Sequence, residues 1–111
     1  MEILKMAAFC CLGLMIALPA LAQEDGATIY KSKCARCHGS DGMSHTFEGK
    51  MTKAAQFSSD DVMKMSDPDL VAVVKNGKKK MPGFAKKLTD DQINAVVAYV
   101  HTLQQQTPPA K

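Results

Sequence analysis

Two cysteines and a histidine stand close together in the segment KCARCHGSDG, residues 33–42. Cys34 and Cys37 are separated by two residues, and His38 follows the second cysteine directly. Side chains three positions apart lie on the same side of a helical turn. The two thiols can therefore act together on one partner group, with an imidazole beside them.

Three uses of such a cysteine pair are to be distinguished. A zinc site normally needs four ligands, often from a second pair, and His45 and His101 do not form one. A thioredoxin-type pair follows a strand, whereas the residues before Cys34 do not alternate as a strand does. The third use is covalent attachment of haem, for which C-x-x-C-H is the recognised pattern. We therefore expect one haem c, attached through Cys34 and Cys37, with His38 as an axial ligand of its iron.

A second axial ligand decides whether the iron mainly transfers electrons or binds small molecules. The candidates are Met43, Met51, Met63, Met65, Met81, His45 and His101. Met81 stands out because Pro82 restricts its backbone, and Gly77 and Gly83 permit bends on either side. We predict that Met81 is the second axial ligand and that the two histidines have no cofactor role. The residues expected in the pocket wall are Phe47, Met51, Phe57, Met63, Met65, Phe84 and Leu88.

The N-terminal segment predicts export. Residues 1–22 contain an apolar run from Met6 to Leu18, and Ala20 and Ala22 form a small-residue cleavage site. The run is shorter than the ~20 apolar residues that a membrane-spanning helix needs. We expect cleavage of a signal peptide and no stable membrane insertion afterwards. The mature domain is then residues 23–111, and we favour a bacterial periplasm over a thylakoid lumen.

The hydrophobic pattern predicts three main helices. The first starts at Glu24 or Asp25 and runs to about Ala35, and the second has Asp67 as N-cap with Pro68 at N1. The last opens with a capping box, Thr89 to Gln92. Its apolar stripe, interpreted as core, is Ile93, Val96, Val97, Val100 and Leu103. Between His38 and the second helix we expect mostly loop, with one short helix possible within residues 58–63.

The order of these features resembles the small monohaem class I cytochromes c, in the style of the cytochrome c6-like group and the short bacterial cytochromes. The matching residues are Gly26, Tyr30, Cys34 to Gly39, Met81 to Phe84, and Tyr99. The resemblance implies an all-α fold in which three main helices and long loops surround the haem. It also implies that His38 and Met81 are axial ligands. We expect the first and last helices to cross, with Gly26 allowing their close approach.

The resemblance further implies a soluble one-electron carrier rather than an enzyme. Two alternatives stay open: a haem protein with a labile sixth position, acting as a gas sensor or weak peroxidase, and a haem-free thiol module. The formal net charge is +3, too modest to suggest nucleic-acid binding. Six lysines flank Met81, namely Lys75, Lys78, Lys79, Lys80, Lys86 and Lys87. We expect a monomer whose basic rim attracts acidic redox partner proteins.

Overall fold

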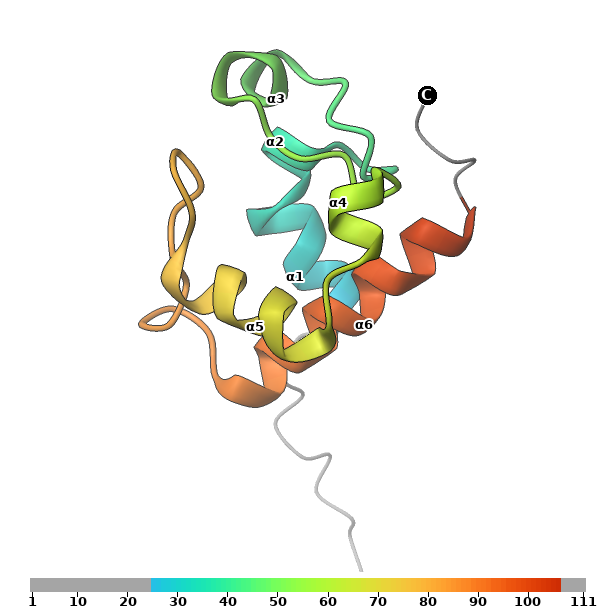
Figure 1. The fold of residues 1–111 in the computed structure, drawn as a ribbon. Helices are drawn as coiled ribbons and strands as arrows, with labels where there is room; N and C mark the ends of the chain where they lie inside the picture. The colour runs from blue at the N-terminus through green and yellow to red at the C-terminus, as the bar shows by residue number, and fades with distance from the viewer. Residues whose placement is uncertain (1–24, 107–111) are drawn as a thin grey trace, which may run out of the picture.

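The structure, a computed structural model, describes residues 25–106. The predicted signal peptide, residues 1–22, lies outside the described residues. Within the described part there are six helices and no β-strand (Figure 1). They are α1 (Gly26–Lys33), α2 (Ala35–His38), α3 (Phe47–Thr52), α4 (Asp60–Met63), α5 (Asp67–Asn76) and α6 (Asp90–Gln106). The predicted all-α class is confirmed.

Helices α1 and α6 pack against each other and carry most of the core (Figure 1). Asp25 caps α1 by accepting a hydrogen bond from the Thr28 amide at 2.8 Å. A Cβ atom added at Gly26 would collide with the carbonyl oxygen of Ala95 in α6, so glycine permits the close approach. Tyr30 lies 5.2 Å from Tyr99, measured between ring centroids. The predicted crossing of the first and last helices is confirmed.

Helix α6 starts as predicted. Thr89 and Gln92 bond to each other's backbone amides, at 2.8 and 3.1 Å, in the reciprocal pattern of a capping box. The predicted apolar stripe, Ile93, Val96, Val97, Val100 and Leu103, is buried along its full length. This stripe gives α6 one face for the core and leaves the opposite face polar.

Two helix boundaries differ from the sequence-based expectation. The first helix does not continue to Ala35: α1 ends at Lys33, and α2 begins after a break at Cys34, where φ is −116°. Helix α5 begins one residue earlier than expected, because Ser66 rather than Asp67 is the N-cap and accepts from the Asp69 amide at 3.3 Å. The short helix that the sequence allowed within 58–63 is confirmed: it is α4, capped by Ser59.

Helix α3 was not foreseen. Its N-cap Thr46 accepts a hydrogen bond from the Gly49 amide and donates to the carbonyl oxygens of Arg36 and Cys37, at 2.8 and 3.0 Å. Helix α3 is therefore fixed by tertiary bonds to α2 rather than by a periodic apolar stripe. Helix α3 packs next to α2 (Figure 1), and its last residue, Thr52, lines the cavity described below.

Candidate functional site

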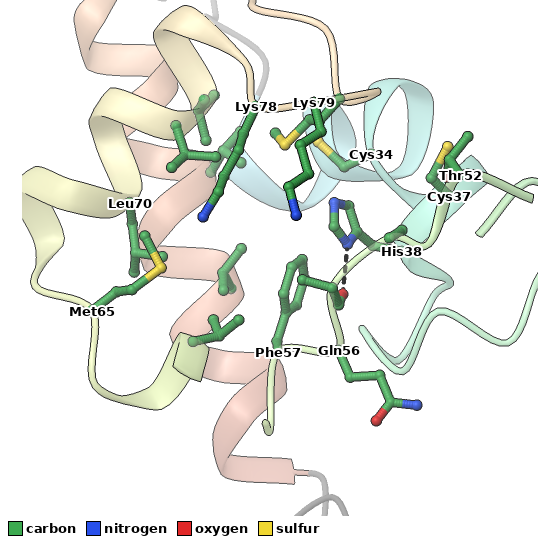
Figure 2. A pocket seen from close by; sticks show the side chains of 18 of the residues that line it. Cys34, Cys37, His38, Thr52, Gln56, Phe57, Met65, Leu70, Lys78 and Lys79 are labelled. Atoms are coloured by element: carbon green, nitrogen blue, oxygen red, sulfur yellow. Dashed lines mark hydrogen bonds between the residues drawn. The ribbon is translucent and has the colours of Figure 1, made fainter. Parts of the chain in front are cut away.

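A cavity of about 970 Å³ lies between the helices, at the upper end of the range of about 300–1,000 Å³ for ligand pockets. Its lining comes from α1, α2, the segment 52–65, α5, the loop 78–84 and α6. Cys34, Cys37, His38 and Met81 all line it. Figure 2 shows His38 on one side of the cavity and Leu70 with Met65 on the other. The fold thus brings together the four residues that the sequence singled out.

The ring of His38 is held in a defined orientation. Its Nδ1 lies 3.0 Å from the carbonyl oxygen of Ala55, shown as a dashed line in Figure 2. A carbonyl only accepts hydrogen bonds, so Nδ1 carries the proton and donates it. Burial lowers the pKa of His38, while the bond to Ala55 partly opposes that shift. The neutral imidazole therefore keeps the lone pair of Nε2 available as a metal ligand.

Two further contacts support His38. The ring of Phe57 stacks on the imidazole, with centroids 4.6 Å apart and an interplanar angle of 29°. Ser44, which is buried, donates its hydroxyl to the same Ala55 oxygen at 2.7 Å. The segment 55–57 therefore fixes His38 through both a backbone carbonyl and an aromatic face.

The two cysteines are partly buried, line the cavity and are not joined by a disulfide. Burial raises the pKa of the Cys34 thiol to about 11, so this group stays protonated at neutral pH. A reactive redox cysteine instead has a lowered pKa and exists as a thiolate. Within residues 25–106 no group of three or more His, Cys, Asp or Glu side chains forms a metal-binding cluster. These observations do not favour a thiol redox pair or a zinc site.

Met81 lies in a loop that is tied to α5. Lys78 and Met81 exchange backbone hydrogen bonds of 3.1 and 2.9 Å, and the Phe84 amide donates to the Val74 carbonyl at 2.8 Å. Gly77, with φ of +78°, lies so close to the Met81 carbonyl that a side chain there would meet it at 2.5 Å. The turn that presents Met81 is therefore compact and constrained.

The structure reduces the number of candidate thioether ligands to two. Met65 and Met81 line the cavity, whereas Met43, Met51 and Met63 do not. Met43 accepts a hydrogen bond from Ser58 at its sulfur. Of the histidines other than His38, His45 is exposed, and His101 bonds to Asp67 and Gln104. Neither lines the cavity.

The expected pocket wall is partly wrong. Phe57, Met65 and Phe84 line the cavity as predicted. Phe47, Met51 and Met63 are instead 76%, 61% and 55% exposed, and Leu88 packs into the core beside Ile29. The first two lie on α3, whose formation turns them toward solvent.

The sequence analysis did not identify several other residues that line the cavity. They are Tyr30, Leu70, Val73, Val74, Val96, Val97 and Val100. The last three belong to the stripe interpreted only as core, and the signal that could have identified them was this same stripe. In so small a chain one apolar helix face serves both the core and the cavity.

The residues around the cavity fit a haem. Two thiols and a neutral imidazole follow each other at the spacing of the attachment pattern, and two thioethers are available as soft ligands. The remaining wall is largely aliphatic and aromatic, which suits the apolar faces of a porphyrin.

Comparisons with known proteins agree with this site. The sequence profile of the family described as cytochrome c oxidase, cbb3-type, subunit III, matches residues 21–100. Cytochrome c6 of Parathermosynechococcus lividus is 36% identical over 78 residues, which cover 68% of this chain and 84% of the relative. Subunit CcoP of the Azospirillum brasilense cbb3-type oxidase is 33% identical over 86 residues, covering 76% of this chain but 29% of that longer protein.

A solved structure also matches. It is described as the KustC0563 c-type cytochrome and superposes with a TM-score of 0.67 at 30% identity, covering 73% of this chain and 99% of that one. The chain therefore belongs to the c-type cytochromes, as a small monohaem class I member that carries a covalently attached haem c.

Proposed function

We propose that this protein is a one-electron carrier in which Cys34 and Cys37 hold the haem and His38 and Met81 are the axial ligands. The observation that carries the proposal is the orientation of His38, whose Nδ1–H is committed to Ala55 while the ring lines the cavity beside both thiols. When bound, the haem supplies an iron that alternates between ferrous and ferric states. No substrate is transformed in this role.

Three features of the chain support a site that rearranges little between the two oxidation states of the iron. The carbonyl of Ala55 fixes the tautomer of His38 and raises the basicity of Nε2. The aliphatic side chains of α5 and α6 limit the access of water to the cavity. Backbone bonds hold the loop of Met81 against α5. Each feature reduces the rearrangement that accompanies a change of charge.

Lysines at the edge of the cavity support a docking role for the Met81 loop. Lys78, Lys79 and Lys80 are exposed and line the cavity, as Figure 2 shows for the first two. Lys80 Nζ also donates to the carbonyl oxygen of Met51 at 3.4 Å, which joins this loop to α3. Positive charge beside the entrance favours acidic redox partners and negatively charged oxidants.

Export and oligomeric state complete the proposal. We infer a cleaved leader over residues 1–22 and a bacterial periplasmic location, because covalent haem attachment is here combined with a signal-peptide pattern. No helix among the described residues is long and apolar enough to cross a membrane. The protein then acts as a monomer that meets its partners by diffusion.

An optical redox titration of the purified protein tests the function. The proposal expects one reversible one-electron transition, a low-spin spectrum in both states, and no binding of carbon monoxide to the ferrous form at neutral pH. Rapid carbon monoxide binding would instead indicate an open sixth position and a sensor or peroxidase role. A protein without a haem spectrum would contradict both.

A further inference from the structure

A series of hydrogen bonds connects the exposed side of α6 to the segment 55–57, which holds His38. Gln104 donates its Nε2 to the carbonyl oxygen of Phe57 at 3.0 Å, across 47 positions of sequence. The Oε1 of Gln104 lies 2.8 Å from Nδ1 of His101, and Nε2 of His101 lies 2.6 Å from Oδ1 of Asp67. These hydrogen bonds thus link Asp67, the first residue of α5, to the segment 55–57 that contacts His38.

The geometry of these hydrogen bonds determines which atoms carry the protons. The Phe57 carbonyl accepts only, so the nitrogen of the Gln104 amide must face it and the amide oxygen must face His101. That oxygen and the Asp67 carboxylate are both acceptors. Each ring nitrogen of His101 must therefore donate, which requires the doubly protonated imidazolium.

Phe57 is the member of this hydrogen-bond series that lies next to the proposed haem site. Its ring stacks on His38, and its own amide donates to the carbonyl of Gly42 at 2.9 Å. Ala55, two residues earlier, accepts the Nδ1–H of His38. Gln104 is thus the α6 anchor of the segment that orients the imidazole.

We propose that Gln104 is a positioning residue for His38 and that the protonation state of His101 determines whether Gln104 holds Phe57. This inference rests on the proposed function, because it requires His38 to be an iron ligand. It assigns to α6 a pH-sensitive control over the reduction potential.

Loss of one proton from His101 disrupts this series of hydrogen bonds. The remaining proton stays on Nε2, facing the charged Asp67, and Nδ1 becomes an acceptor opposite the Gln104 oxygen. The Gln104 amide can donate to Nδ1 only by flipping, which would turn its oxygen toward the Phe57 carbonyl and break the bond to Phe57. The hydrogen bond from Gln104 to Phe57, called the anchor below, is therefore formed when His101 is charged and is weakened when His101 is neutral.

Asp67 is the charged group that faces His101. It comes from α5, while α1, the other helix packed on α6, provides no ion-pair partner to His101 among the described residues. The hydrogen bond to Asp67, followed by the one to Gln104, raises the pKa of His101 above its usual 6.5. The anchor is thus complete below that value and is lost as pH rises through the higher pKa of the folded protein.

The expected effect is on the reduction potential. A firm Nδ1–H bond to Ala55 makes the imidazole a stronger electron donor, which favours ferric iron and lowers the potential. When Phe57 is released, the bond loosens and the potential rises. Deprotonation of His101 also removes a positive charge, which acts in the opposite direction, so a variant comparison is needed to separate the two.

The test compares holoprotein variants Gln104→Leu and Gln105→Leu by potentiometric titration across the pH range of His101. Gln105 is the matched control, since it lies next to Gln104 on α6 and is exposed. In Gln104→Leu the anchor is always absent, but His101 still titrates. Its potential should lie above that of the wild type at low pH and converge with it above the pKa of His101, while Gln105→Leu should follow the wild type throughout.

A second variant, Asp67→Asn, keeps an acceptor for His101 but removes the charge, and Ser66 still caps α5. It should move the pH midpoint of convergence downward and leave the low-pH potential nearly unchanged. NMR titration of the His101 ring and the Gln104 side-chain amide should give the same midpoint. Coincident curves for Gln104→Leu and wild type, or an offset that is constant at all pH values, would overturn the inference. Failure of the proposed function differs, since the wild type itself would then lack a His38-ligated low-spin spectrum.

Discussion

The carbonyl oxygen of Ala55 accepts two hydrogen bonds, one from Nδ1 of His38 at 3.0 Å and one from the hydroxyl of Ser44 at 2.7 Å. The relationship between Ala55 and His38 fixes the tautomer on which the proposed ligation by Nε2 depends. Because a backbone carbonyl supplies the contact, no side chain at position 55 is needed for it. A sequence pattern therefore cannot reveal this partner.

The identity of the thioether ligand can be tested with a matched pair, Met81→Leu and Met65→Leu, because both methionines line the cavity. We expect Met81→Leu to lose the sulfur-to-iron charge-transfer band of the ferric protein and to bind carbon monoxide when reduced. Met65→Leu should retain the band and stay closed. The reverse pattern would assign ligation to Met65.

The close approach of α1 and α6 predicts a cost for Gly26→Ala. The new methyl group would collide with the Ala95 carbonyl, so the two helices must move apart. This separation should lower the free energy of unfolding by about 1–3 kcal/mol. Denaturant titration measures this. Lys31→Ala, on the exposed side of α1, is the control and should change the stability by less than about 0.5 kcal/mol. Equal effects of the two substitutions would contradict the tight crossing.

Tyr30 anchors the turn that follows His38. Its buried hydroxyl donates to the Gly39 carbonyl at 2.6 Å, and Gly39 has a φ of +79°. Tyr30→Phe should lower the free energy of unfolding by about 1 kcal/mol, since the carbonyl loses its partner. Tyr99→Phe alters the neighbouring ring, whose hydroxyl makes no hydrogen bond within the described residues, and should have little effect. An unchanged free energy of unfolding in Tyr30→Phe would show that this hydrogen bond does not contribute to stability.

The ion pair of His101 with Asp67 predicts a small pH-dependent stability. Because the pKa of His101 is raised on folding, its contribution is complete below about pH 6.5 and disappears as pH rises through the folded-state value. The pair is exposed, so the difference between wild type and His101→Gln should stay below about 1 kcal/mol. Thermal unfolding from acidic to alkaline pH measures it. A difference that grows with pH would have the wrong sign.

The basic loop predicts charge-selective electron transfer. Oxidation of the reduced protein by hexacyanoferrate(III), a trianion, should be slowed roughly two- to threefold by Lys79→Gln at low ionic strength and little at high salt. Lys31→Gln, on α1 and outside the cavity lining, removes the same charge as a control. Replacing Lys78, Lys79 and Lys80 together should give a larger decrease. Equal effects of Lys79→Gln and Lys31→Gln would show that only net charge matters.

Most features predicted correctly are those that local sequence determines. The capping box at Thr89 and the apolar stripe on α6 each have a local cause. The close approach at Gly26 is a tertiary contact with Ala95, and it was expected from the resemblance to class I cytochromes c. The spacing of Cys34, Cys37 and His38 is also a local feature, and all three residues meet at one cavity.

The features missed depend on tertiary contacts. Helix α3 is fixed by the bonds of Thr46 to α2, so Phe47 and Met51 could not be placed from periodicity. The support of His38 by Ala55, and that of Phe57 by Gln104, joins residues 17 and 47 positions apart. Neither link has a signature in residue type. The choice between Met65 and Met81 likewise depends on ligation, which the spacing of methionines does not fix.

The intact mass of the purified, exported protein after denaturation tests the central claim most directly. The proposal predicts a polypeptide that begins at Gln23 and is heavier than its amino acids by one haem, because the two thioether bonds survive denaturation. A Cys34→Ser, Cys37→Ser variant should lack this added mass. A wild-type mass equal to that of the amino acids alone would contradict covalent attachment.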